Sequence, residues 1–259
     1  MERVGVIIVA GGAGVRCGGR IPKQFALLGG VPVLARTIGN FAQALPGARI
    51  VVVLPAEYVD FWQNLRARFD VAPHAVVAGG AERFDSVRCG LEALAPDVGL
   101  IAVQDGVRPL GTLKLIRRTV AVAAEHGTAV PVVEATDSYR EAEGEGSRVV
   151  DRRRLRIVQT PQIFRADLLR DAYEAAYRPD FTDDASVVEH AGHAVRLCEG
   201  ERQNLKITRP EDFVMAEALL AAREEGAYEE GAYEEGSYEE GSYEERGCEE
   251  GARGARPEE

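Results

Sequence analysis

The sequence predicts an α/β protein built on a doubly wound, mostly parallel sheet. Short continuous apolar runs alternate with amphipathic segments of helical length from the N-terminus to residue 133. This order is typical of strands that are buried on both faces and joined by crossover helices. Glycines or an acid follow three of the expected strands, at Gly11, Gly79 and Asp105. Because ligands bind at the carboxyl ends of strands in such sheets, we expect these positions to share one edge.

The first expected strand, Val4–Ala10, leads into a glycine-rich loop that carries two cations. Glycine lets backbone N–H groups turn toward an anion and lets a ligand approach closely. Arg16 and Lys23 would add positive charge to a bound triphosphate, and Pro22 stiffens the backbone between them. A flexible surface turn is the alternative, which two cations at fixed offsets behind a buried strand disfavour. The loop glycines are Gly11, Gly12, Gly14, Gly18 and Gly19.

Two other glycine motifs are excluded by inspection. A dinucleotide fingerprint needs G-x-G-x-x-G, but Cys17 occupies the position of the last glycine when the count starts at Gly12. A P-loop needs Gly before its Lys and Ser or Thr after it, whereas Lys23 lies between Pro22 and Gln24. The loop therefore belongs to a different class of phosphate-binding segment.

The remaining elements continue the alternation as far as the middle of the chain. The segment 32–45 has apolar residues at helical spacing and ends at Pro46-Gly47. Further helices are predicted over 57–69, 82–94 and 113–125, and strands over 49–55, 75–78, 100–103 and 128–133.

Residues 134–156 interrupt this order. The segment is polar and has Gly144-Glu145-Gly146 in its middle, which predicts a β-hairpin arm projecting from the sheet. Beyond it the pattern predicts a return to the core at 157–164, a helix at 166–177, and another helix opened by Thr182 or a following Asp as N-cap. A last strand at 193–198, a loop at 204–208 with Lys206, and a helix at 210–223 with Pro210 at N1 complete the body.

The net charge of −11 comes from the C-terminal segment. Residues 224–259 hold 14 Glu and 3 Arg in a near-perfect EEGAY/EEGSY repeat, which leaves 28 cations and 28 anions in residues 1–223. A neutral body has no basic field for nucleic acid. The repeat has too few aliphatic residues to offset chain entropy, so we expect a domain at 1–223 and an acidic disordered tail at 224–259. The tail tyrosines leave a docking segment as the alternative.

Composition limits the location and the kind of site. No apolar stretch is long enough for a membrane-spanning helix, and the N-terminus lacks the cleavage site of a signal peptide. The four cysteines form no C-x-x-C pair, which fits a reduced, cytoplasmic protein and not a disulfide framework or zinc site. The weak His190/His193 pair is interpreted as solvated turn residues. Only three cations are lysines, Lys23, Lys114 and Lys206, and Lys114 is taken as a surface residue.

Seven motifs occur in one order along the body. They are GGAGVRCGGRIPKQF (11–25), GGAERFDSV (79–87), QDGVRP (104–109), ATDSYR (135–140), QTPQIF (159–164), FTDDAS (181–186) and NLKITRPED (204–212). The glycine loop resembles the G-x-G-x-R and x-P-K signature of sugar-nucleotide pyrophosphorylases. All seven motifs together resemble the 2-C-methyl-D-erythritol 4-phosphate cytidylyltransferase family, over residues 3 to 222.

That resemblance implies a Rossmann-like nucleotidyltransferase fold, Mg²⁺ as cofactor, CTP and a small polyol phosphate as partners, and a homodimer joined by the arm. The implied reaction is transfer of CMP to methylerythritol phosphate with release of pyrophosphate, in non-mevalonate isoprenoid precursor synthesis. A phosphate monoester has a second pKa near 6, so it is already a dianionic nucleophile at neutral pH and needs no general base. Catalysis then consists of positioning and charge neutralisation.

The resemblance also implies residue roles. The catalytic groups are Arg16, Lys23, Arg152 and Lys206. Nucleotide is bound by Ala10, Gly11, Gly12, Gly14, Gly80, Ala81, Ser86 and Asp105, and Asp105 also ligates the metal. The acceptor is bound by Arg108, Ser138, Thr160 and Thr182.

Alternatives stay open for several of these residues. Arg16 and Lys23 would otherwise be surface cations, Asp105 a turn residue before Gly, Arg152 one solvated charge in an arginine run, and Thr182 only an N-cap. Three positions depart from the family pattern: Gly106-Val107 after the metal carboxylate, Arg140 where Lys is usual, and Ala81 where Asp is common. The rival functions are a ribitol 5-phosphate cytidylyltransferase and an inactive nucleotide-binding protein whose tail recruits a partner.

Overall fold

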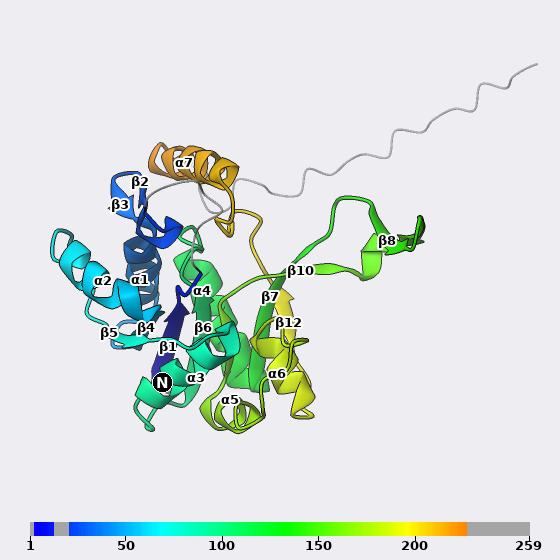
Figure 1. Ribbon diagram of the computed structural model, residues 1–259, viewed down its shortest axis with the longest axis horizontal. Coiled ribbons are helices and arrows are strands. Elements are labelled where there is room, and N and C mark those ends of the chain that lie inside the picture. Colours follow the sequence, from blue (N-terminus) through cyan, green and yellow to red (C-terminus); the bar gives the residue numbers. More distant parts are fainter. Residues whose placement is uncertain (1–2, 13–20, 227–259) are drawn as a thin grey trace, which may run out of the picture.

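Eight strands form the central sheet of the protein. In the computed structural model, which describes residues 3–12 and 21–226, these strands are β1 (Val4–Val9), β4 (Arg49–Leu54), β5 (Ala75–Ala78), β6 (Leu100–Asp105), β7 (Thr128–Glu134), β10 (Arg156–Val158), β11 (Gln162–Arg165) and β12 (Leu197–Glu199). Their order is β10-β7-β11-β6-β1-β4-β5, with β12 paired to β7 (Figure 1).

The sheet is mostly parallel, as predicted. β5, β4, β1 and β6 run in one direction, and β12 pairs with β7 in the same sense. β11 lies between β6 and β7 and is antiparallel to both, and β10 is antiparallel to β7. The α/β class and the doubly wound arrangement are confirmed.

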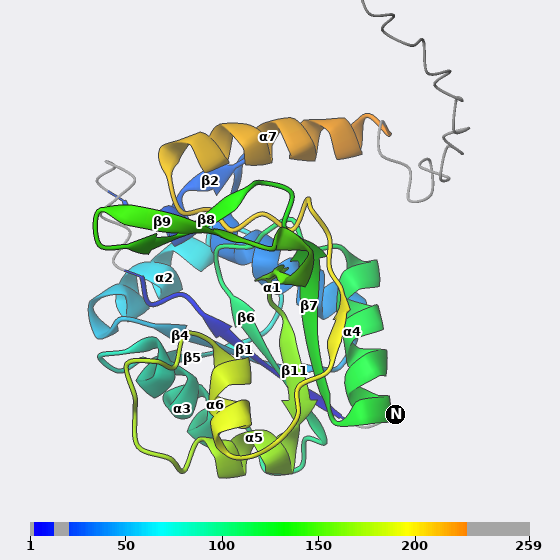
Figure 2. The same ribbon diagram turned by 90° about the vertical axis from the view of Figure 1, so that its right-hand side faces the viewer.

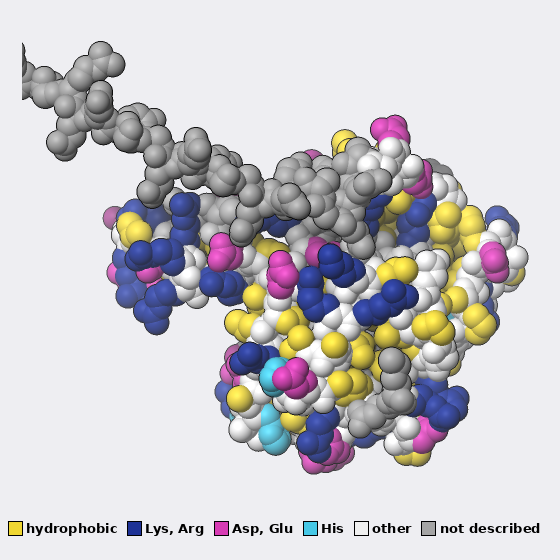
Figure 3. Space-filling view, turned by 180° about the vertical axis from the view of Figure 1, so that it is seen from behind, with side chains coloured by type: hydrophobic (Ala, Val, Ile, Leu, Met, Phe, Trp, Pro, Cys, Tyr) yellow, Lys and Arg dark blue, Asp and Glu magenta, His cyan; other side chains and the backbone are white. Residues whose placement is uncertain are grey.

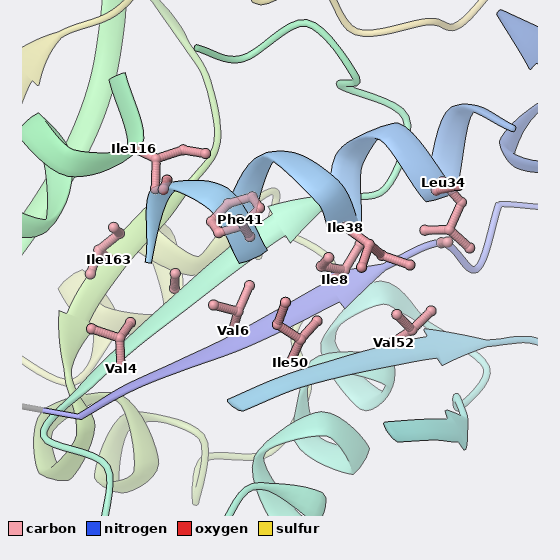
Figure 4. Packing of buried hydrophobic residues seen from close by; sticks show 14 of the residues in the cluster. Val4, Val6, Ile8, Leu34, Ile38, Phe41, Ile50, Val52, Ile116 and Ile163 are labelled. Carbon is pink, nitrogen blue, oxygen red and sulfur yellow. The ribbon is translucent and has the colours of Figure 1, made fainter. Parts of the chain in front are cut away.

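Helices cover both faces of the sheet. One face carries α1 (Val33–Ala44), α2 (Val59–Arg66) and α4 (Leu113–His126), and the other carries α3 (Arg83–Ala93), α5 (Ala166–Ala172) and α6 (Asp184–His190). Strand β1 shows why its sequence is apolar throughout. Val6 and Ile8 pack toward α1 (Figure 4), whereas Ile7 packs toward α3. Each such burial stabilises the fold by roughly 1.5–3 kcal/mol.

A third, smaller core lies at the carboxyl end of the parallel strands. There α7 (Pro210–Glu224) crosses above the hairpin of β2 (Leu27–Leu28) and β3 (Val31–Pro32) (Figures 1 and 2). Ile207, fully buried in this core, donates its N–H to Val107 O at 2.9 Å. The loop that carries Lys206 is therefore anchored one residue beyond that lysine.

The predicted arm is present as a two-stranded hairpin, β8 (Tyr139–Glu143) and β9 (Gly146–Val150). It projects away from the body (Figure 1), and residues 139–149 are all exposed. Gly144 has a φ of 56°, the left-handed conformation that a glycine adopts without strain at a hairpin tip. A 3₁₀ turn, Arg152–Arg154, leads back to the sheet.

Several elements differ from the sequence predictions. The helix expected at 166–177 ends at Ala172, because the chain turns so that the Tyr173 hydroxyl reaches Asp184. The helix expected at 57–69 is a 3₁₀ turn, Ala56–Tyr58, followed by the shorter α2. The strand expected at 193–198 is observed only as the shorter β12, Leu197–Glu199. Strand β10 is not core, because Ile157 and Val158 are 45% and 41% exposed.

Other predictions concern segments outside the described ranges. The acidic tail lies there from residue 227 on, as do Gly14, Arg16, Gly18 and Gly19 of the glycine loop. Helix α7 ends at Glu224, close to the predicted end of the folded domain. Within the described ranges, none of the helices combines the length and the apolar character that a bilayer crossing requires.

Candidate active site

One cavity of about 340 Å³ lies at the carboxyl ends of the central strands. Nine of the residues predicted from the sequence to act in the site line it together: Ala10, Gly11, Gly12, Lys23, Gly80, Ala81, Ser86, Asp105 and Lys206. The predicted convergence of three strand ends on one edge is thus confirmed for the part of the chain that the structure describes.

The sheet register brings these strand ends together. Val9 lies opposite Asp105 across the β1–β6 pair. Beyond the end of β1, Ala10 N donates to Val53 O at 2.9 Å, and beyond the end of β5 the Gly79 N–H donates to Leu54 O of β4 at 2.7 Å. The cavity floor is therefore made of backbone that the sheet hydrogen bonds hold in place.

Two glycines are required by close packing at the start of α3. A Cβ on Gly80 would lie 2.3 Å from Asp85 Cβ, and a Cβ on Gly79 would lie 2.6 Å from Ser86 Oγ. The same hydroxyl lies 3.7 Å from the corresponding point on Gly11. The buried Ser86 hydroxyl is thus placed between the two glycine segments, where it can donate to or accept from a ligand.

Lys23 begins a short 3₁₀ turn, Lys23–Phe25, at the cavity wall. The next residue, Gln24, is buried and donates from Nε2 to Ala10 O at 2.9 Å and to Gly12 O at 3.3 Å. Phe25 packs on Trp62, with ring centroids 5.9 Å apart. The segment that carries Lys23 is therefore held in place by the aromatic packing of Phe25 and by the hydrogen bonds of the Gln24 amide.

Asp105 is surrounded by cationic side chains. Its Oδ2 lies 3.0 Å from Lys206 Nζ and 3.2 Å from Arg108 Nε, and its Oδ1 lies 3.9 Å from Arg83 Nε. Burial raises the pKa of this carboxyl, but the charges of Lys206, Arg83 and Arg108 outweigh burial and hold the pKa at about 2. Asp105 is therefore a carboxylate at every pH at which the fold is expected to function.

Thr160 and Arg108 belong to the shell behind Asp105. The Asp105 N–H donates to Thr160 Oγ1 at 3.0 Å. Asn204 Nδ2 donates to Thr160 O, and Arg108 Nη1 donates to Asn204 O, each at 2.8 Å. These contacts place two predicted acceptor residues beside the cavity and tie them to the segment that precedes Lys206.

Arg108 and Thr160 lie behind the cavity and do not line it, and three other predicted acceptor or catalytic residues of the described ranges, Ser138, Arg152 and Thr182, do not line it either. Ser138 and Arg152 flank the arm, where both are exposed, and Arg152 Nη1 donates to Thr136 O. Thr182 precedes Asp183, whose carboxylate caps α6 by accepting from Ser186 N at 2.9 Å. The N-cap is thus Asp183. Gly14 and Arg16 lie outside the described residues.

The same architecture and motifs occur in known proteins. A family model described as 2-C-methyl-D-erythritol 4-phosphate cytidylyltransferase matches residues 4–222. The curated protein of that name from Bacteroides thetaiotaomicron is 47% identical over 217 residues, which are 83% of this chain and 98% of the relative. The one from Porphyromonas gingivalis is 45% identical over 218 residues, 83% and 97% of the two chains. The chain belongs to this family. It is a nucleotidyltransferase of isoprenoid biosynthesis.

Solved structures of the cytidylyltransferase family share the fold. The structure of 2-C-methyl-D-erythritol 4-phosphate cytidylyltransferase from Thermus thermophilus is 34% identical, with a TM-score of 0.67 over 85% of this chain and all of that chain. The 4-diphosphocytidyl-2C-methyl-D-erythritol synthase from Anaerococcus prevotii is 25% identical, with a TM-score of 0.72 over 85% and 99% of the two chains. The predicted nucleotidyltransferase fold is confirmed.

Two cavity residues of this cytidylyltransferase were missed by sequence reasoning. Arg83 and Gln24 both line the cavity, and both lie inside motifs already singled out, GGAERFDSV and the segment after Pro22. The position of Arg83 in the sequence could have indicated a site residue, because Arg83 begins the helix that follows Gly79-Gly80. Their partners, Asp184 and the Ala10 carbonyl, are remote in the sequence, so no local pattern reveals what these side chains hold.

Two acidic residues line this cavity, Asp105 and Glu82, and the Glu82 side chain takes part in the capping box of α3. Among the residues that the structure describes, no group of three or more His, Cys, Asp or Glu side chains is arranged to hold an ion. Mg²⁺ commonly takes one or two carboxylates from the protein and its other ligands from water and substrate phosphates. Asp105, ionised and at the cavity wall, fits that mode of binding and does not form a complete protein-only site.

Proposed function

We propose that this cytidylyltransferase transfers CMP from CTP to 2-C-methyl-D-erythritol 4-phosphate and releases pyrophosphate. The observation that carries the proposal is the single cavity in which Ser86 and Gly80 lie opposite the Gly11 segment, with Lys23, Lys206 and Asp105 at its wall. Nucleoside fits against the backbone of the glycine segments, where N–H and C=O groups recognise its edges. The phosphates then face the two lysines.

The residues supply electrostatics and position. The acceptor phosphate, with a second pKa near 6, carries two negative charges at neutral pH and attacks the α-phosphorus of CTP without a general base. Lys23, together with Arg16 of the same loop, neutralises the charge that develops on the α-phosphate. Lys206 offers a further positive charge between the nucleotide and the acceptor, and Arg108 and Thr160 complete the acceptor side.

Mg²⁺ is the proposed cofactor, with Asp105 as its protein ligand. When bound, the ion neutralises triphosphate charge and so lowers the repulsion between the two substrates. Lys206 and Arg108 keep the Asp105 carboxylate ionised and oriented by their contacts at 3.0 and 3.2 Å. Substitution of Asp105 by Asn should therefore weaken Mg²⁺ dependence as well as turnover, measured by titrating the metal at fixed CTP.

The arm supports a proposal of a homodimer. An isolated two-stranded ribbon is marginally stable in water, and the arm exposes Val149 (75%) and Tyr139 (36%). Arginines gather on the same projection (Figure 3). Pairing of two arms about a two-fold axis covers the apolar side chains and carries Ser138 and Arg152 toward the partner's acceptor site.

We place the enzyme in the cytoplasm, which is supported by the free thiols Cys89 and Cys198.

The deciding experiment measures pyrophosphate release with two acceptors and two nucleotides. Methylerythritol 4-phosphate with CTP should give turnover, whereas ribitol 5-phosphate with CTP should give little, and UTP should replace CTP poorly. Preference for ribitol 5-phosphate would assign the enzyme to the rival acceptor. No pyrophosphate with either acceptor would favour an inactive nucleotide-binding protein.

A further inference from the structure

Arg83 lies where the nucleotide cavity meets the segment that carries Thr182. It is the first residue of α3 and lines the cavity. Its Nη1 and Nη2 donate to Asp184 Oδ1 and Oδ2 at 3.0 and 2.7 Å. A planar guanidinium that meets a carboxylate through two parallel hydrogen bonds fixes orientation as well as distance.

Asp184 is the buried end of this contact. Its side chain has no exposed surface, and the Tyr173 hydroxyl also donates to its Oδ1, at 2.7 Å. Burial lowers the pKa of Arg83, but the charge of Asp184 outweighs burial and raises it. Because a buried carboxylate without its partner is costly, this pair is a fixed point of the fold.

The neighbours of Asp184 are held with it. Gln162 Nε2 donates to Asp183 Oδ2 at 2.9 Å, and Ala185 N donates to Gln162 Oε1 at 2.8 Å. Thr182 directly precedes these anchored residues. Its position is therefore set by Gln162 from β11 and by Arg83 from α3.

The Arg83 guanidinium is oriented toward protein carboxylates. Both Nη atoms are directed at Asp184, and Nε lies 3.9 Å from Asp105 Oδ1, beyond hydrogen-bond distance. Arg83 thus bridges two carboxylates of the protein, one in the nucleotide cavity and one beneath the acceptor segment.

We infer that Arg83 is a positioning residue for the acceptor, acting through Asp184. The inference rests on the proposed function and on the acceptor role that the family resemblance implies for Thr182. In this role Arg83 holds the segment that carries Thr182 at a fixed distance from the nucleotide cavity. The acceptor is then bound at a fixed position relative to the nucleotide. Its substitution should affect acceptor binding more than CTP binding.

The test compares Arg83→Lys with Arg88→Lys on the same helix. Arg88 is half exposed, pairs with the nearby Asp85 and lies over the ring of the neighbouring Phe84. Arg83→Lys should raise the acceptor KM about tenfold, the scale of one lost charge-assisted hydrogen bond. It should change the KM for CTP by no more than about twofold, and Arg88→Lys should change neither by more than that.

Two further measurements keep the inference testable if turnover is lost. Hydrogen exchange at the amides of 182–186 should accelerate in Arg83→Lys and in Asp184→Asn, and remain unchanged in Arg88→Lys. The double variant Arg83→Lys/Asp184→Asn should raise the acceptor KM no further than the larger single effect, because the two residues act as one unit.

Two results would overturn the inference. A rise in the KM for CTP as large as that for the acceptor would make Arg83 a nucleotide ligand, and unchanged exchange at 182–186 would show that it does not hold the segment. Failure of the proposed function gives a different result: the unsubstituted enzyme would not use methylerythritol 4-phosphate. The exchange comparison would still report whether Arg83 fixes residues 182–186.

Discussion

The cavity and the arm use charge in opposite ways. In the cavity, Asp105 is nearly buried, with its contacts to Lys206 and Arg108 within 3.2 Å. On the arm, Arg148 pairs with Glu141 and Glu143 while more than half exposed. Exposed pairs of this kind contribute about 0–1 kcal/mol each, whereas breaking a buried pair costs several kcal/mol.

This difference shows which part of the site one subunit builds alone. The cavity is positioned by sheet hydrogen bonds and by two hydrophobic cores, so its geometry is set before any ligand arrives. The arm has no core of its own, and its residues gain fixed positions only when something packs on them.

The largest effect is expected from removing the arm. Replacing residues 135–155 with a short Gly-containing turn should abolish detectable turnover and give a monomer by sedimentation, because the proposed homodimer would lose the residues that reach the partner's acceptor site. Glu145→Gln at the exposed hairpin tip should retain activity and dimer. A shortened protein that remains fully active would show that each subunit completes its site alone.

The next largest effect concerns Lys23. Lys23→Ala should lower kcat by about 100- to 1000-fold, as expected for loss of one group that stabilises transition-state charge. Lys23→Arg should restore only part of it, because the guanidinium is larger and planar. The matched control is Lys114→Ala, on the exposed face of α4, which should retain normal kcat. Near-normal turnover in Lys23→Ala would remove Lys23 from the mechanism.

The pH dependence separates Asp105 from the acceptor. With its pKa held at about 2, below its ordinary value, Asp105 contributes stability that is present above pH 4 and lost only as pH falls through about 2. The acid limb of kcat/KM for the acceptor should instead follow the acceptor phosphate, falling about tenfold per pH unit below its pKa near 6. An acid limb that moves in Asp105→Asn would assign the titration to the protein.

Subunit mixing tests the sharing of sites directly. Arg16→Ala and Arg152→Ala proteins should each be inactive. Refolded together in equal amounts they should recover about a quarter of normal activity, because half the dimers are hybrids with one intact site. Verified hybrids without activity would rule out the cross-subunit role of Arg152.

The smallest effect is expected from the tail. Deleting residues 226–259 removes 12 Glu and 3 Arg, so the isoelectric point should rise from about 5.0 while kcat and melting temperature stay nearly constant. Differential scanning calorimetry of both proteins measures this. A melting temperature several degrees lower would show that the repeat packs on the body.

Sequence periodicity predicted the centre of the sheet well because β1, β4 and β6 are buried on both faces. The expected strand at 75–78 matches β5 to the residue, and the helix expected at 113–125 differs from α4 by one residue. Strand β6 extends two residues past its predicted end, because Asp105 pairs with Val9. Prediction failed where a remote contact decides the local structure, as at Tyr173, whose bond to Asp184 shortens α5.

The same rule decides which residues of the candidate site could be predicted from the sequence. Glycines, lysines and Asp105 were found from the sequence because they directly follow strands in short motifs. The roles of Arg83 and Gln24 were not, because each depends on a partner contributed by a distant segment. The hairpin of β2 and β3 was also missed, since two-residue strands have no periodicity to detect.

The position of β1 in the sheet has a consequence for biosynthesis. Strand β1 is synthesised before both of its neighbours in the sheet, β4 and β6, and the last residue of β6 comes nearly 100 positions after β1. At about 5–20 residues per second of translation, β1 waits about 5–20 s for that neighbour. Lys206 follows later still. A nascent chain therefore exposes an apolar strand for seconds, and a chain released before residue 206 contains the glycine segments of the cavity without the lysine that pairs with Asp105.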